Sequence, residues 1–433
     1  MKYTRLIKIL FIVFVVKQLL WGFLTPWATG PDEIGHLSYI QEIFHTLNLP
    51  QYGHAAIYQN SYAEVPGTEI NWIAQHPPLY YLLLTPIYFF AQLNSGLDPI
   101  YILRIFSILF GLLTLMAAAK IIREIRQKQP DIFDLTALSF IAFNPMFSHL
   151  SSVVNNDNLV ISLSSWLTYF LIRYERSPEK KTALNIGTLL GLALLTKATI
   201  LPFLIPLFFV FGKRVFKSLK LAIPELFRVI TMPLLIAGWW YIGNYLKFGV
   251  LIPELKDLNP SLYLGDTQLM KSFPELINNQ HPQYSLFKFF FQDNFIFEFF
   301  KNFWGTFGNL TNQLSLYQYF LFLLIIVLAI FGYLKRIKKN KKISKPEIVF
   351  LIIIFSYLIS ISIKVFQISA GRGFLGAAQG RYLFLAIIPL TYLLTEGITS
   401  FLGKRKYLLN ILILLLLFND FYSLFFTLIP KLI

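Results

Sequence analysis

Long apolar segments alternate with short basic clusters along the whole chain. The first segment, LIKILFIVFVVKQLLWGFLTPW, is close to the roughly 20 apolar residues needed to cross a bilayer, and many later segments are similar. The pattern predicts an all-α polytopic membrane protein with about eleven transmembrane helices. The expected spans are 7–26, 101–121, 134–152, 158–172, two arms of a short hairpin at 183–211, 221–242, 316–334, 347–366, 381–399 and 407–427.

The basic clusters between these segments indicate how the chain is oriented. Lys and Arg are concentrated in cytoplasmic loops of membrane proteins, so we expect all the clusters to lie inside. This arrangement predicts a multi-pass protein of the cell (plasma) membrane with a cytoplasmic N-terminus. The clusters are Lys2/Arg5/Lys8, 120–128, 173–181, 213–220, 335–345 and 404–406.

Two long loops then fall outside the cell membrane, at 28–99 and 243–315. We expect both to belong to a single transmembrane domain, 1–433. The first loop contains PPLYYLLLTPIYFFAQL, residues 77–93, which is apolar enough to cross the membrane. A crossing there would invert the orientation of the 120–128 cluster, so we interpret this segment as an interfacial or re-entrant helix at the outer leaflet.

Composition agrees with a membrane protein and excludes some chemistry. Hydrophobic residues make up 56% of the chain, charged residues 14%, and mean hydropathy is +0.59. The net charge of +16 follows from the clusters in the loops and does not indicate a nucleic-acid partner. Cysteine is absent from the sequence, which excludes disulfides and thiolate metal sites. The acidic residues permit a divalent cation, but no ligand spacing requires one.

The stretch TGPDEIGHLSYI, directly after the first apolar segment, carries the first candidate site. Asp32 and Glu33 stand at the start of an amphipathic helix, with His36 one turn later. Acidic residues are common in first helical turns, so a capping role is one interpretation. A general base or a metal ligand beside a membrane cleft is the other.

Further polar residues stand at the predicted outer side. His76 precedes a double proline, and VVNNDN places Asp157 at the end of a predicted hairpin; an interfacial side chain and a turn residue are the alternative interpretations. Lys197 lies in an otherwise uncharged membrane hairpin, where an ionisable group is costly and usually functional. Arg372 and Arg381 suit phosphate binding or could be snorkelling side chains.

Together these residues place acids, cations and aromatic rings on one face. The aromatic candidates, which could lie against a sugar ring, are Trp239, Trp240, Tyr245 and Trp304. Cations for a phosphate and a carboxylate for a hydroxyl proton suit glycosyl transfer from a lipid-phosphate-linked sugar.

An ordered series of motifs resembles a known family. The strings are PDEIGH, HPPLYYLLL, NPMFSHLSSVVNNDNLV, LLTKATILPFLIP, GWWYIGNYLKFG, FWGTFG and QGRYLFLAIIPL. In this order they resemble bacterial membrane glycosyltransferases of the GT-C fold, related to protein O-mannosyltransferases (glycosyltransferase family 39) and aminoarabinose transferases. The resemblance covers about residues 7–400. It implies a polyprenyl-phosphate-sugar donor, a glycan, lipid or protein hydroxyl as acceptor, and an extracytoplasmic active site in the cell envelope.

The resemblance also implies individual roles. Asp32 would deprotonate the acceptor in an inverting displacement, and Glu33 would orient the acceptor or bind a metal. Lys197 and Arg381 would stabilise the donor phosphate. His36, His76, Asp157, Trp240, Arg372 and Tyr382 complete the expected substrate-binding set. Two alternatives remain open: a transporter or flippase for polyprenyl-linked sugars, which needs no base, and a ligase or polymerase that moves whole oligosaccharides.

Overall fold

A computed structural model describes residues 2–93, 96–254, 257, 284–308, 311–376, 378–403, 405 and 407–431. This part of the chain is almost entirely helical, and its one sheet is a two-stranded antiparallel hairpin. The long helices are α1 (Lys2–Leu24), α4 (Pro99–Arg126), α7 (Asp157–Arg176), α10 (Leu219–Phe248), α13 (Leu316–Asn340), α14 (Lys345–Arg372), α15 (Ile387–Leu402) and α16 (Tyr407–Tyr422).

Shorter elements connect these helices. The α-helices are α2 (Glu33–Thr46), α3 (Leu79–Gln92), α5 (Ile132–Ala142), α6 (Pro145–Leu150), α8 (Lys180–Leu194), α9 (Leu204–Lys217) and α12 (Phe295–Trp304). The 3-10 helices are η1 (Trp72–Gln75), η2 (Ala198–Phe203), η6 (Gly380–Ala386) and η8 (Ile429–Lys431), the π-helical turns are η5 (Lys288–Gln292) and η7 (Ser423–Leu428), and the strands are β1 (Thr306–Phe307) and β2 (Asn312–Gln313).

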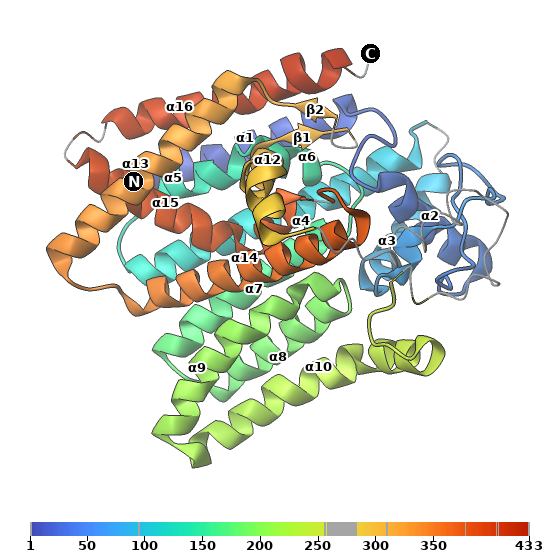
Figure 1. Cartoon of the computed structure of the whole chain (residues 1–433), viewed down its shortest axis with the longest axis horizontal. Helices are drawn as coiled ribbons and strands as arrows, with labels where there is room; N and C mark the ends of the chain where they lie inside the picture. The colour runs from blue at the N-terminus through green and yellow to red at the C-terminus, as the bar shows by residue number, and fades with distance from the viewer. Residues whose placement is uncertain are drawn as a thin grey trace.

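The helices form a bundle, and two groups of shorter and longer helices lie at its sides. Figure 1 shows α2 and α3 together at the right of the bundle, with α8, α9 and α10 along its lower side. Helix α7 packs against both α4 and α8 and so joins the N-terminal helices to this lower side. Helices α13 and α15 pack closely, because a Cβ at Gly397 would lie only 2.0 Å from the carbonyl oxygen of Ala329.

Within the described ranges, eight helical segments are long and apolar enough to cross a membrane. They match eight of the predicted spans, and the prediction of an all-α multi-pass membrane protein is confirmed. The remaining three predicted spans are also helical but are shorter, more polar or interrupted. The segment 134–152 is divided into α5 and α6 because Asn144 caps a new helix and Pro145 occupies its first turn. The count of eleven therefore stays a prediction.

The two loops that we predicted to lie outside, 28–99 and 243–315, contain short elements. Helix α3 packs against α2 and α4 and carries Pro86 in its interior; its relation to the bilayer stays a prediction. In the second loop the described part holds η5, α12 and the hairpin, whereas residues 258–283 lie outside the described residues. Residues 404 and 406 of the last basic cluster also lie outside them.

Lys17 and Asp420 form a buried ion pair inside the bundle. Lys17 of α1 lies 3.0 Å from Asp420 of α16, and both side chains are fully buried. Lys17 also donates a hydrogen bond to Ser148 of α6. The first and last of the described long helices are thus joined by compensating charges.

Removing one partner of this pair should be costly. We expect Lys17→Met or Asp420→Leu alone to lower the free energy of unfolding by about 3 kcal/mol, because an uncompensated charge remains buried. The double variant should lie close to the wild type. Thermal unfolding of the detergent-purified protein measures all three, and additive losses in the double variant would contradict a direct pairing.

Candidate active site

Four charged side chains form one network at one end of the bundle. A carboxylate oxygen of Asp32 lies 3.1 Å from the Arg381 guanidinium. Arg381 Nε lies 3.6 Å from Asp157, whose other oxygen accepts a 2.6 Å hydrogen bond from Lys197. Negative and positive groups therefore alternate, and the formal charges of the four sum to zero. The structure brings together Asp32, Asp157, Lys197 and Arg381, as the sequence predicted.

Each of these residues lies where a helix begins or is interrupted. Asp32 precedes α2 with φ of 56°, Asp157 is the first residue of α7, and Lys197 has an extended backbone between α8 and η2. Arg381 lies in η6, which packs against α12. A Cβ on the preceding Gly380 would lie 2.3 Å from the Phe299 carbonyl oxygen, so glycine is required for this close approach.

Asn155 joins the loop 28–99 to Asp157. Its side-chain amide donates to the Pro31 carbonyl at 2.7 Å, and its side-chain oxygen accepts from the Asp157 amide at 2.8 Å. The backbone amide of Asn155 donates to the Tyr80 hydroxyl at 3.0 Å. This asparagine therefore holds the residue before Asp32 and the start of α7 in fixed relation.

Glu33 occupies a different environment from its neighbour Asp32. Its side chain is fully buried and accepts two hydrogen bonds from Arg104, at 2.7 and 2.9 Å, and one from the Val154 amide at 3.0 Å. Arg104 also donates to the carbonyl oxygens of Gly22, Thr25 and Pro26. Three hydrogen bonds from protein donors hold the buried Glu33 carboxylate, which favours a positioning role over the expected one of orienting the acceptor or binding a metal.

Trp72 also contacts Asp32 and was not expected from the sequence. Its indole nitrogen donates to Asp32 at 3.4 Å. Asn71 fixes η1 by accepting from the Ile73 amide and donating to the Gly35 carbonyl of α2, both at 3.0 Å. The sequence feature that could have identified Trp72 is its position four residues before His76. Arg104 could have been identified as a single charged residue in an apolar span.

Two histidines stack beside the network. The rings of His36 and His76 lie 6.4 Å apart at 10°, and His36 Nδ1 lies 2.9 Å from the Tyr81 hydroxyl. Burial, with a further contribution from Lys197, lowers the pKa of His36 well below its ordinary value and that of His76 to about 3. Both rings are therefore neutral at physiological pH and can donate or accept hydrogen bonds without adding charge.

A cavity of about 190 Å³ opens beside Lys197 and His76. Trp240 and Asn244 of α10 line it together with Thr199, and the ion pair between Glu254 and Lys364 lies at its border. It meets a smaller cavity of about 30 Å³, and the two share Gln75, Trp240 and Asn244.

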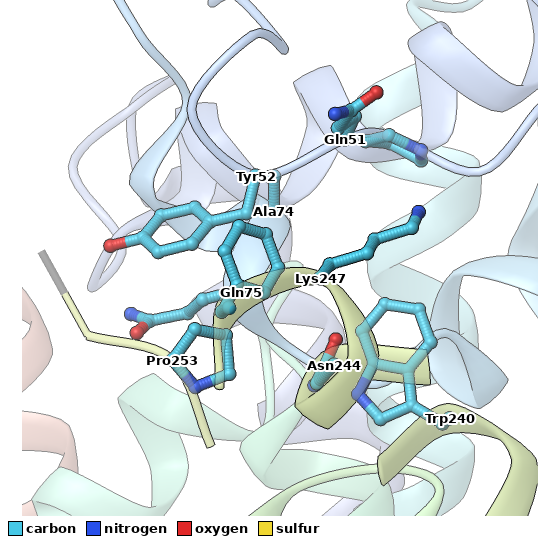
Figure 2. Close-up of a pocket in the computed structure, with 10 residues that line it drawn as sticks. Gln51, Tyr52, Ala74, Gln75, Trp240, Asn244, Lys247 and Pro253 are labelled. Carbon is cyan, nitrogen blue, oxygen red and sulfur yellow. The ribbon is translucent and has the colours of Figure 1, made fainter. Parts of the chain in front are cut away.

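Figure 2 shows that this smaller cavity lies between two segments of the chain. Gln51, Tyr52, Ala74 and Gln75 come from the loop 28–99. On the other side, α10 contributes its residues, with Trp240, Asn244 and Lys247 labelled in the view.

The remaining expected residues differ in their relation to the network. The Tyr382 ring centre lies 5.7 Å from the Lys197 amine and 5.5 Å from the Arg381 guanidinium carbon, so this ring contacts both cations. Arg372 is half-buried at the C-terminal end of α14. Among the described residues, no group of three or more His, Cys, Asp or Glu side chains is arranged to hold a metal ion.

Comparison with known proteins gives the class of the fold. The sequence model for dolichyl-phosphate-mannose-protein mannosyltransferase matches residues 75–241, which include His76, Asp157, Lys197 and Trp240. Among curated proteins, none matches the chain significantly in sequence.

Solved structures match over nearly the whole chain. ArnT from Cupriavidus metallidurans in the apo state is 15% identical with a TM-score of 0.52, over 92% of this chain and 60% of ArnT. The same enzyme bound to undecaprenyl phosphate is 14% identical with a TM-score of 0.52, over 93% and 62%. The oligosaccharyltransferase AglB from Archaeoglobus fulgidus, in complex with an inhibitory peptide and a dolichol-phosphate, is 14% identical with a TM-score of 0.51, over 99% and 56%.

These matches establish that the chain has the GT-C membrane fold that the sequence resemblance implied. The chain spans about 60% of the length of the ArnT and AglB structures that it matches.

The buried Glu33 should contribute to stability rather than to chemistry. We expect Glu33→Gln to lower the free energy of unfolding by about 3 kcal/mol, because it leaves the buried charge of Arg104 uncompensated. Glu64→Gln, at an exposed position of the same loop, is the matched control and should unfold like the wild type. Thermal unfolding in detergent compares the two, and equal stability of both variants would refute the assignment.

Proposed function

We propose that the protein is an inverting glycosyltransferase that uses a polyprenyl-phosphate-linked sugar. The observation that carries this proposal is the ion-pair network that joins Asp32 to Lys197 and Arg381 beside a cavity. In the reaction, an acceptor hydroxyl oxygen forms a bond to the anomeric carbon while the bond from that carbon to the phosphate oxygen breaks. The hydroxyl proton passes to Asp32, and the bonding electrons stay on the leaving polyprenyl phosphate.

The side chains divide naturally between the two substrates. Lys197 and Arg381 would bind the donor phosphate and stabilise the charge that develops on it. Asp32 is the general base, since its side chain is 38% exposed whereas that of Asp157 is buried. Trp240 and Tyr382 provide aromatic surfaces for the sugar. His76 lines the cavity and adds a neutral hydrogen-bonding group there, and His36 is stacked against it.

The size of the cavity supports a single sugar on the donor. At about 190 Å³ it is smaller than the roughly 300 Å³ at which pockets for drug-sized ligands begin. A polymerase or ligase that moves a whole oligosaccharide would need more space. A transporter would need the cations but no partly exposed carboxylate beside them.

The structural relatives support a lipid-phosphate donor. ArnT binds undecaprenyl phosphate in one structure, and AglB is in complex with a dolichol-phosphate and a peptide in another. We therefore propose a polyprenyl-phosphate sugar as donor for this chain, with a glycan, lipid or protein hydroxyl as acceptor.

We also propose that the active site is extracytoplasmic, in a single domain of eleven spans with a cytoplasmic N-terminus. Helix α7 begins at Asp157 in the network and ends near Arg173 and Arg176. These ends lie about 30 Å apart, because 20 helical residues rise about 1.5 Å each. Basic helix ends thus lie roughly a membrane thickness from the network, as the positive-inside rule requires for an outer site.

Two substitutions separate the chemical role from the binding role. Asp32→Asn should reduce release of polyprenyl phosphate from a polyprenyl-phosphate monosaccharide by at least about 100-fold and retain donor binding, because the base is lost while the cations for the phosphate remain. Lys197→Ala should weaken donor binding. Full transfer activity in the first variant would exclude Asp32 as the base, and unchanged donor affinity in the second would exclude Lys197 from the phosphate site.

Reporter fusions test the orientation. We expect a reporter inserted at residue 60 to be extracytoplasmic and one inserted at residue 340 to be cytoplasmic, because they lie on opposite sides of the predicted spans. Alkaline phosphatase and a cytoplasmic fluorescent protein give opposite signals at the two positions. Both reporters on one side would refute the topology.

A further inference from the structure

Two neighbouring carboxylates pair with arginines in different ways. Glu33 is fully buried and makes two hydrogen bonds to Arg104, which makes three more to backbone carbonyls. Asp32 makes one contact with Arg381, at 3.1 Å, and its side chain is 38% exposed. A bidentate buried pair is permanent, whereas a single-contact, partly exposed pair can exchange partners at small cost.

The pair with Arg381 conflicts with the roles of both residues in the proposed function. Asp32 must have a free oxygen to accept the acceptor proton, and Arg381 must direct its donors at the phosphate. Arg381 Nε has no hydrogen-bond partner in the described part of the chain, and Asp157 lies 3.6 Å away from it. Arg381 Nε is thus a donor without a close acceptor, and it lies next to the carboxylate that binds Lys197.

We propose that the donor phosphate and Asp32 compete for Arg381, so that binding of the donor frees the base. This inference rests on the proposed function. It predicts an ordered reaction: the lipid-linked sugar binds first, Arg381 transfers its hydrogen bond from Asp32 to the phosphate, and the freed carboxylate then receives the acceptor hydroxyl. If the acceptor binds before the donor, Asp32 is still paired with Arg381 and cannot accept the hydroxyl proton.

Trp72 holds Asp32 in place once Arg381 is engaged elsewhere. Its indole nitrogen donates to the other carboxylate oxygen of Asp32 at 3.4 Å. Because Asn71 ties η1 to α2, this donor does not depend on Arg381. Trp72 is thus a positioning residue.

The same competition assists product release. When Asp32 accepts the hydroxyl proton it becomes neutral and cannot recover Arg381, which stays on the polyprenyl phosphate while that group carries its full charge. Once Asp32 loses the proton to water, it again competes for Arg381 and favours departure of the lipid phosphate.

Titration of the purified full-length protein with undecaprenyl phosphate tests the competition. We expect Asp32→Asn to bind the probe about tenfold more tightly than the wild type, because a charge-assisted hydrogen bond no longer has to be replaced. In an Arg381→Gln background the same substitution should change the affinity by a factor of about one. Asp32→Glu, which retains the charge, is the matched control and should bind like the wild type.

Each other outcome overturns the inference. An unchanged or weaker affinity of Asp32→Asn excludes competition, and a gain that persists in the Arg381→Gln background indicates general electrostatic repulsion instead. If Arg381→Gln does not fold, Arg381→Met, which removes both the charge and the hydrogen-bond donors, supplies the background. A wild type that fails to bind undecaprenyl phosphate refutes the proposed function as well, whereas binding without competition refutes only the order of events.

Discussion

A buried ion pair between Glu33 and Arg104 fastens the start of α2 to the N-terminal end of α4, and the position of Asp32 follows from it. Arg104 donates to three carbonyl oxygens at the end of α1 and just after it, while Glu33 accepts from the amide of Val154 just before α7. One pair therefore joins four segments. In a low-dielectric interior such a pair contributes only if its geometry is complete, and here the guanidinium makes five hydrogen bonds.

The charges around the site are balanced without a ligand. Two carboxylates neutralise Lys197 and Arg381, which allows cations to lie in a largely buried position. In the proposed function, a phosphate would replace a carboxylate that is already there and would not have to meet an isolated charge. The neutral histidines His36 and His76 add no positive charge, so affinity for the phosphate would depend on the two cations.

The sequence predicted the fold class and the residues of the network, because both depend on local signals. Apolar length gives the spans, and Lys197 is identifiable by its cost in an uncharged hairpin. It did not predict which of Asp32 and Glu33 faces the site. That choice depends on the left-handed backbone at Asp32, which turns adjacent side chains in different directions, and on a partner, Arg104, 71 residues away. Long-range pairing of this kind leaves no periodic pattern in a chain.

The 3-10 helix η1 connects Asp32 with the two cavities. Its first residue, Trp72, contacts Asp32, its last, Gln75, lines both cavities, and His76 follows directly. These four residues thus lie between Asp32 and the cavity beside Lys197. Because Asn71 anchors η1 to the first turns of α2, a movement of either element displaces both. In the proposed mechanism Asp32 and the cavity therefore move together, and only the Arg381 hydrogen bond passes from the carboxylate to the phosphate.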